Sequence, residues 1–263
     1  MESLSSPPTA VQPLPSLRRT VPQPRFKTRL HFIWAVIWAA WWTMIFAPIV
    51  IVHATFRPGA RTLQRWIRPW ARLLLWGIGV RLHTAMRAPL DPAQPVVFVA
   101  NHQNALDILT TAAGIPTPFG FTAKAALRRT PFIGAVLAHT ACVFVDRSTP
   151  RRAVRSMVEA GAQIRAGNAV LVFAEGHRTW KTELAPFLRG AFMLAVEAGV
   201  PVVPVVLDGD VGVLDERVWS SRPGDVRLVI GEPIPTDGCA RRDIPALMNT
   251  ARKWMEWELG REE

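Results

Sequence analysis

Apolar and polar positions alternate from Val96 onward in the way expected of strands that alternate with helices. Short apolar runs bounded by turn residues predict strands at 96–100, 141–145, 169–173, 202–207 and 226–230. Longer segments with helical periodicity predict helices at 105–113, 150–166, 188–198 and 243–259. This alternation predicts an α/β domain in which helices cover a sheet.

The N-terminal third holds the most apolar segment of the chain, residues 32–52, which only Thr43 and Pro48 interrupt. As a helix this segment would extend roughly 30 Å, enough to cross a bilayer core. It is too long for a signal peptide, and no small-residue cleavage site follows it. Basic residues are equally frequent on both sides, so the positive-inside rule selects no orientation. We therefore expect a re-entrant or monotopic helix pair with Pro48 at a bend; a single span is the alternative.

Arginines recur in the following segment at spacings that place them on one face of a helix. They are Arg57, Arg61, Arg65, Arg68 and Arg72, and the opposite face carries Leu63, Ile67, Trp70 and Leu74. Anionic headgroups would attract each exposed arginine by about 1 kcal/mol, and tryptophan favours the headgroup level. The predicted membrane contacts are Trp38, Trp41, Trp42, Arg61, Arg65 and Arg68; an ordinary solvated helix face is the alternative for the arginines.

Composition divides the chain into three parts. Residues 1–25 are rich in proline and poor in bulky side chains, which predicts a disordered tail. Residues 26–88 form the predicted membrane-associated helical segment. The stretch 88–95, APLDPAQP, has the composition of a linker, and residues 89–263 form the predicted α/β domain.

The net charge of +11 is confined to the N-terminal third. Residues 1–90 hold 12 of the 31 Lys/Arg residues and one of the 20 acidic residues, so the remainder is neutral. A basic, tryptophan-rich, apolar segment indicates a membrane surface, and the neutral remainder argues against nucleic acid as a partner. Cys142 and Cys239 form neither a disulfide framework nor a metal-binding motif, so no metal is expected.

His102 follows the predicted strand 96–100 directly, at the strand end where α/β sheets bind ligands. It is a candidate general base, and Asp107 can fix its tautomer by accepting the proton on the other ring nitrogen. Residues five apart on one helix lie about 140° apart, so His102 must precede the helix that carries Asp107. Asn104 can begin that helix at Ala105 as its N-cap. The alternatives are a structural strand-end histidine and an Asp107 that only completes a capping box.

The stretch NHQNALD, residues 101–107, resembles the NHxxxxD block of the glycerolipid acyltransferases. The stretches VFVDR (143–147), FAEGHRT (173–179) and VPVVPV (200–205) resemble the three later blocks of that family. AKAALRRTPFIG (123–134) and the segment 184–205 also follow the pattern of 1-acylglycerol-3-phosphate acyltransferases. Four blocks in the right order identify the chain as a member. The resemblance implies a glycerolipid acyltransferase-like α/β domain with a mixed sheet flanked by helices, preceded by the membrane-associated helix pair.

The resemblance implies a reaction and a set of residues. His102 would deprotonate the sn-2 hydroxyl of lysophosphatidic acid, which attacks acyl-CoA or an acylated carrier protein and gives phosphatidic acid. No cofactor and no acyl-enzyme are required, and the sequence has no GxSxG serine elbow. The implied phosphate-binding residues are Glu175, Gly176, Arg178, Arg147 and Lys124, with Glu175 orienting a base rather than touching phosphate. The expected location is a membrane, with the active site on the cytoplasmic face.

Several positions depart from the family pattern. His177 stands where threonine is usual, Ala141 and Cys142 where glycine is common, and Leu188 and Arg189 where a lysine pair is frequent. These departures put the acceptor in doubt, so a different lysolipid is the nearest alternative. A catalytically inactive lipid-binding membrane protein is the second alternative, and the retention of both His102 and Asp107 argues against it.

Overall fold

A computed structural model describes residues 17, 20–56, 60–130, 134, 137, 142–146 and 148–260. Its centre is a seven-stranded sheet in the order β1-β9-β6-β2-β5-β3-β4. The strands are β1 (Val80–Met86), β2 (Val97–Ala100), β3 (Phe119–Lys124), β4 (Val143–Val145), β5 (Ala169–Phe173), β6 (Val202–Asp208) and β9 (Gly224–Ile230). Adjacent strands are parallel except at β6–β9, which is antiparallel. The sheet is therefore mixed, as expected.

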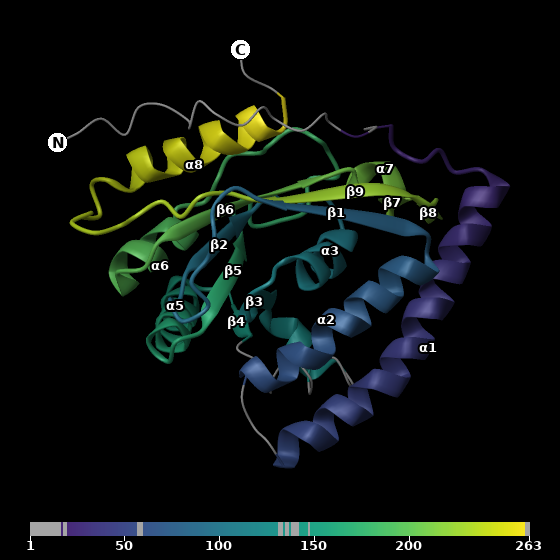
Figure 1. The fold of residues 1–263 in the computed structure, drawn as a ribbon, viewed down its shortest axis with the longest axis horizontal. Helices are drawn as coiled ribbons and strands as arrows, with labels where there is room; N and C mark the ends of the chain where they lie inside the picture. The colour runs from purple at the N-terminus through teal and green to yellow at the C-terminus, as the bar shows by residue number, and fades with distance from the viewer. Residues whose placement is uncertain are drawn as a thin grey trace.

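Helices cover both faces of this sheet (Figure 1). Helices α5 (Pro150–Arg165), α6 (Gly190–Ala198) and α8 (Ile244–Glu258) pack on one face, through Ile164, Phe192 and Leu247 among others. Helices α2 (Ala60–Gly77) and α3 (Leu106–Gly114) pack on the other, through Ala71, Leu75 and Ala113. Short elements complete the fold: η1 (Ala125–Arg129), α7 (Asp210–Val213), β7 (Leu214–Asp215) and β8 (Ser220–Ser221).

The predicted strands and helices of the α/β domain correspond to elements of the structure with small shifts at their ends, and β5 matches in full.

Two strands of the sheet, β1 and β3, are absent from the elements that the sequence predicts. β1 pairs with β9 along its whole length, from Val80 with Gly224 to Met86 with Ile230. The α/β domain therefore begins at Val80 and not at residue 89, and the linker 88–95 is the turn between two strands of one sheet. In β1 only Val80, Leu82 and Ala85 are buried or half-buried, and the exposed Arg81 and His83 give this edge strand the basic, polar character of the segment before it.

Helix α1 (Phe26–Phe56) lies along the outside of the molecule and forms a pair with α2 (Figure 1). Tryptophans join the two helices: the Nε1 atoms of Trp34 and Trp38 donate to the carbonyls of Gly77 at 2.9 Å and Leu73 at 3.2 Å. Pro48 lies within α1 and does not end the helix. In the described part of the chain, α1 is the one helix long and apolar enough to cross a bilayer, and only 11% of its most apolar window is buried.

The structure separates the predicted membrane contacts into two groups. Trp41 is 62% exposed and Arg65 is exposed, as a membrane contact requires. Trp38 and Trp42 are half-buried, and Trp38 is bonded to α2. Arg68 is half-buried and donates to the carbonyl of Ala113 at 3.3 Å, so it joins α2 to α3. Arg57 and the side chain of Arg61 lie outside the described residues.

The predicted tail also differs from expectation where it is described. Residues 20–25 run along β8: Arg222 donates to the carbonyl of Thr20 at 2.6 Å and Ser220 to the carbonyl of Gln23 at 3.3 Å. The backbone N–H of Leu17 donates to Asp208 at 3.2 Å. This segment is therefore hydrogen-bonded to the α/β domain through its backbone, although its amino-acid composition is typical of disordered chains. Residues 1–16, 18 and 19 lie outside the described part.

Charged groups are buried where α8 crosses the sheet. Arg227 on β9 is 4% exposed and lies 3.1 Å from Asp208 on β6 and 3.6 Å from Glu258 on α8, both fully buried. Glu258 also binds the guanidinium of Arg87 through both oxygens, at 2.7 and 2.8 Å. A buried charge is tolerated only with such partners. Arg227 therefore offsets part of the cost of burying the carboxylates of Asp208 and Glu258.

We expect Arg227→Met to lower the free energy of unfolding by about 3–5 kcal/mol, because it removes a buried ion pair from each of the carboxylates of Asp208 and Glu258. Chemical denaturation in detergent measures the change. Arg81→Met is the control, since Arg81 on β1 is 72% exposed and pairs with Asp225, which lies on β9 as Arg227 does. Equal losses in both variants would contradict the assignment of Arg227 to the core.

Candidate active site

His102 and Asp107 form a hydrogen-bonded pair at the carboxyl end of β2. Nδ1 of His102 lies 2.7 Å from Oδ2 of Asp107. The His102 side chain is 12% exposed and the Asp107 side chain is fully buried. The ring is therefore held between the core and solvent, and Nε2 is the nitrogen that remains for a ligand.

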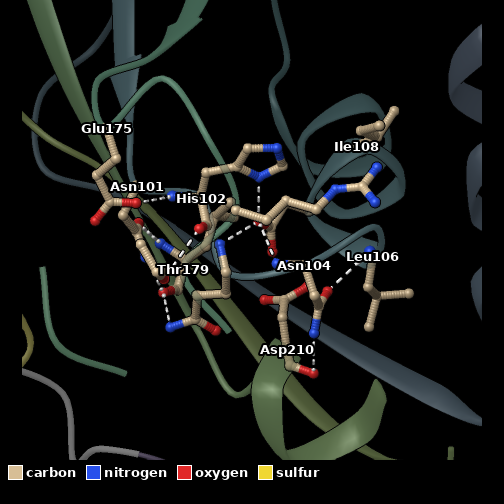
Figure 2. A network of polar contacts seen from close by, with 12 residues as sticks. Asn101, His102, Asn104, Leu106, Ile108, Glu175, Thr179 and Asp210 are labelled. Carbon is tan, nitrogen blue, oxygen red and sulfur yellow. Dashed lines mark hydrogen bonds and ion pairs between the residues drawn. The ribbon is translucent and has the colours of Figure 1, made fainter. Parts of the chain in front are cut away.

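The local sequence makes this contact possible by ending β2 two residues before His102 and beginning α3 at Leu106, one residue later than predicted. The N-cap residue is Ala105, which has no side-chain capping bond, so Asn104 is not the N-cap that the sequence predicts. Asn104 lies one residue earlier and accepts the N–H of Leu106 through Oδ1 at 2.9 Å (Figure 2). Asp107 Oδ2 accepts the backbone N–H groups of Gln103 at 2.5 Å and Asn104 at 3.0 Å. Asp107 thus contacts the His102 ring and also accepts the backbone N–H groups that precede the helix, so its contacts are not limited to those of a capping residue.

Amide side chains fix the same loop to the end of β6. Asn101 donates to the carbonyl of Leu207 at 2.9 Å and accepts its N–H at 2.8 Å, so one side chain replaces a pair of strand hydrogen bonds. Gln103 accepts the N–H of Val211 at 3.2 Å. Asn104 donates to the carbonyls of Asp210 at 2.9 Å and Leu214 at 2.8 Å (Figure 2). Every residue around His102 is therefore anchored to a neighbouring element.

The surroundings of His102 keep its ring neutral. Phe173, the last residue of β5, stacks on the imidazole with ring centroids 3.9 Å apart and planes 11° from parallel. Burial and, after it, the positive charge of Arg178 lower the pKa of His102 to about 4, against the opposing effect of Glu175. At neutral pH the imidazole therefore has a free lone pair, as a general base needs.

Asp107 determines which ring nitrogen carries the hydrogen. Burial raises the pKa of Asp107, and the backbone N–H groups of Asn104 and Gln103 oppose the rise. Because Oδ2 already accepts two N–H groups, it acts as an acceptor toward the ring, and the shared hydrogen belongs to Nδ1. The lone pair of the neutral ring is consequently on Nε2.

Glu175 supports the His102 backbone and does not bind Arg178. It is 1% exposed; Oε2 accepts the N–H of His102 at 2.8 Å and Oε1 accepts the N–H of Ala185 at 2.9 Å. Among its described contacts Glu175 therefore orients the backbone of His102, whereas the guanidinium of Arg178, which it was expected to orient, pairs with Glu216. Gly176 follows with φ of 73°, a turn conformation that favours glycine and directs the chain away from β5.

Arg178 is brought to His102 by a loop that is hydrogen-bonded to the loop after β2. Thr179 donates its N–H to the carbonyl of His102 at 2.9 Å, and Trp180 donates its N–H to the carbonyl of Gln103 at 2.8 Å. The side chain of Arg178 is 37% exposed and pairs with Glu216 at 3.2 Å. A guanidinium thus lies beside the candidate base with part of its surface open to a ligand.

The other predicted phosphate-binding residues lie apart from Arg178 or cannot be placed. Lys124 is exposed at the carboxyl end of β3, two strands from β2 in the sheet order. Arg147 lies outside the described residues. His177, the departure from the family pattern, is exposed beside Arg178. Among the described residues, no group of three or more His, Cys, Asp or Glu side chains could hold a metal ion.

Sequence reasoning missed three residues of the site. Phe173 stacks on His102, and its place before the EGHR stretch was a signal that could have indicated this. Glu216 pairs with Arg178 from the loop between β7 and β8, and no motif marks it. Asp210 is fully buried and accepts the hydroxyl of Thr110 at 2.8 Å. Burial and the charge of Asp107 raise the pKa of Asp210, which favours its neutral form.

Comparisons with known proteins agree with this arrangement. A family model described as Acyltransferase matches residues 80–208, which include β1 and both loops of the candidate site. A crystal structure of the 1-acyl-sn-glycerophosphate (LPA) acyltransferase from Thermotoga maritima superposes with a TM-score of 0.75 at 22% identity, covering 92% of this chain and 99% of that chain. At this identity the likeness establishes the fold.

Relatives of higher identity establish the family. Human 1-acyl-sn-glycerol-3-phosphate acyltransferase alpha is 35% identical over 184 residues, which are 69% of this chain and 64% of that protein. Human 1-acyl-sn-glycerol-3-phosphate acyltransferase beta is 31% identical over 202 residues, which are 76% of this chain and 73% of that protein. The chain thus aligns with slightly less than two thirds of the first relative and with more of the second. It belongs to the acyltransferase family that includes the 1-acyl-sn-glycerol-3-phosphate acyltransferases.

Proposed function

We propose that this chain transfers an acyl group from an acyl thioester to the sn-2 hydroxyl of lysophosphatidic acid and so produces phosphatidic acid. The observation that carries the proposal is the contact of the His102 ring with Asp107 at 2.7 Å, in a site that also holds Arg178. A base and a phosphate-binding cation in one site match an acceptor that has a hydroxyl and a phosphate. The names of the human and Thermotoga relatives support the same acceptor.

His102 is the residue that would move the proton. Nε2 takes the hydroxyl proton as the acceptor oxygen attacks the thioester carbonyl, and the Asp107 carboxylate stabilises the imidazolium that forms. When the tetrahedral intermediate collapses, the carbon–sulfur bond breaks, and the leaving sulfur takes the proton from Nε2. His102 is then neutral again, so the cycle needs neither an acyl-enzyme nor a cofactor.

Arg178 is the residue that would hold the acceptor. A guanidinium binds phosphate oxygens through two parallel N–H groups, which gives both charge and orientation. Binding the phosphate there would place the nearby sn-2 hydroxyl toward His102, because the Arg178 loop is bonded to the carbonyl of His102. Positioning of this kind lowers the barrier by fixing the reacting atoms before the chemical step.

The helix pair would hold the site at a bilayer. Large apolar side chains are exposed along α1, including Ile37 at 57%, Trp41 at 62% and Met44 at 66%. Burying such a surface in lipid is favourable, and the exposed Arg65 and Arg72 on α2 would attract anionic headgroups. We propose membrane lipids as partners and the cytoplasmic face as the location of the site, with α1 and α2 acting as one unit.

A different lysolipid is the second candidate acceptor. Glu216 pairs with Arg178 at 3.2 Å, and its side chain is 21% exposed. A headgroup that carries an ammonium or hydroxyl group would pair with this carboxylate, whereas a phosphate monoester would be repelled by it. Thiol release measured with lysophosphatidic acid and with lysolipids bearing glycerol or ethanolamine headgroups separates the two candidates. If none of these acceptors produces acceptor-dependent thiol release, that result contradicts the enzymatic proposal.

His102→Ala is expected to reduce acceptor-dependent thiol release by roughly 10²–10⁴, since general-base help is lost. The assay is spectrophotometric detection of the free thiol from acyl-CoA in detergent. His83→Ala is the matched control, because His83 is 60% exposed on β1, three strands from β2 in the sheet order. Full activity in His102→Ala would refute the proposed base.

The acid limb of kcat/KM for the acyl donor is expected near pH 4, well below the ordinary histidine value of about 6.5, because burial and Arg178 disfavour the imidazolium. Activity should therefore persist as pH falls through 6.5 and decline toward pH 4. Arg178→Gln removes a positive charge and should move the limb to higher pH. A pH–rate profile at saturating acceptor measures both, and a wild-type midpoint at or above 6.5 would contradict the assignment.

Arg178→Gln should also raise KM for lysophosphatidic acid by about tenfold to a hundredfold, since a charge-assisted hydrogen bond contributes about 1.5–3 kcal/mol. KM for the acyl donor should change little. Arg178→Lys keeps the charge without the two-pronged geometry and should recover part of the loss. Steady-state kinetics with each substrate varied in turn gives the comparison, and an unchanged acceptor KM in Arg178→Gln would place the phosphate elsewhere.

A further inference from the structure

Basic side chains gather in one part of the α/β domain, although residues 91–263 are neutral as a whole. The segment 124–155 contains seven Lys/Arg residues and a single acid, Asp146. The described members of this set are all exposed; they are Lys124, Arg128, Arg129, Arg151, Arg152 and Arg155. The proton-transfer chemistry at His102 uses none of them. Such a local excess of positive charge attracts an anion with several negative charges.

These residues surround a hollow of about 380 Å³. Its lining is Ala125, Ala126, Arg128, Arg129, Asp146 and Arg152, contributed by η1, the end of β4 and the first turn of α5. Arg152 is paired with Asp146 at 3.3 Å, while Arg128 and Arg129 form no ion pair with a described carboxylate. The first turn of α5 has no acidic residue, so the positive end of the helix dipole adds to the guanidinium charges.

The register of the sheet places this hollow beside the candidate active site. Phe98 on β2, Leu171 on β5 and Phe121 on β3 are level with one another, and all three strands run in parallel. His102 and Ala125 each follow this level by four residues, just past the carboxyl ends of β2 and β3. Two strand spacings separate β2 from β3, and three separate β2 from β4, which corresponds to about 10 and 14 Å. His102 and the hollow therefore lie along one edge of the sheet.

We propose that this hollow binds the phosphates of coenzyme A, the adenosine 3′-phosphate 5′-diphosphate end of the acyl donor. The inference rests on the proposed function, because it supplies the donor of that reaction. The pantetheine arm has 13 bonds between sulfur and the first phosphorus, and a peptide with as many backbone bonds extends about 15 Å. This reach matches the separation of the strand ends, so the thioester lies at His102 while the phosphates lie between Arg128, Arg129 and Arg152.

The test compares two acyl donors in the double variant Arg128→Gln/Arg129→Gln. KM for palmitoyl-CoA should rise about tenfold or more, because charge-assisted hydrogen bonds to phosphate are lost. KM for S-palmitoyl-pantetheine, which has no phosphate, and KM for lysophosphatidic acid should change no more than in the control. The control is Arg241→Gln/Arg242→Gln, which changes the net charge equally at side chains that are 76% and 88% exposed near α8.

Binding of adenosine 3′,5′-bisphosphate to the full chain, measured by calorimetry, is a second readout that needs no turnover. It should be detected in the wild type and the control and lost in the Arg128/Arg129 double variant. If the wild type releases thiol from neither donor, the proposed function fails, while this binding still tests the hollow.

Three results would overturn the proposal. The first is an equal loss with both acyl donors, which would indicate a structural role. The second is unchanged kinetics with weaker binding to vesicles of anionic lipid, which would make the patch a membrane contact. The third is a rise in KM for an acylated carrier protein but not for palmitoyl-CoA, which would make it a docking site for an acidic protein.

Discussion

The structure of the site depends on one buried carboxyl group. Asp107 has no exposed side-chain surface, and a carboxylate in such a position ionises only where donors compensate its desolvation. The compensation comes from backbone N–H groups that the chain exposes because it leaves β2 and enters α3 within a few residues. The same turn sets the His102 ring against Asp107. The position of the His102 ring, the compensation of the Asp107 carboxylate and the tautomer of the imidazole are therefore consequences of one short connection. The side-chain amides of Asn101 and Gln103 keep that connection in place.

The sequence was sufficient to predict the parts of this arrangement that follow from local pattern. Short apolar runs identified β2, β5, β6 and β9, and the spacing from His102 to Asp107 required the histidine to precede the helix. Long-range contacts could not be predicted in this way. β1 has the polar character of an edge strand, and only its pairing with β9 shows that it belongs to the sheet. Glu216 reaches Arg178 across 38 positions, and nothing near it in the sequence marks that contact.

The roles of individual charged residues were also difficult to assign from motifs. Glu175 lies in a block whose arginine faces the site, yet its own carboxylate is occupied by backbone N–H groups of His102 and Ala185. Arg68 belongs to a predicted headgroup-binding face, yet it bonds to the end of α3. Motif position predicted His102, Asp107 and Arg178, which the structure brings together, whereas burial and partner geometry determine what each charged side chain contacts.

Helix α3 carries Asp107 in its first turn, and its other end is where Arg68 of α2 bonds to Ala113. It is nine residues long, which corresponds to about 13 Å of axial rise. Helix α3 therefore connects the Asp107 end of the site directly to α2. A shift of α2 against the sheet would be carried to Asp107 through this one short helix, and so to the orientation of the His102 ring.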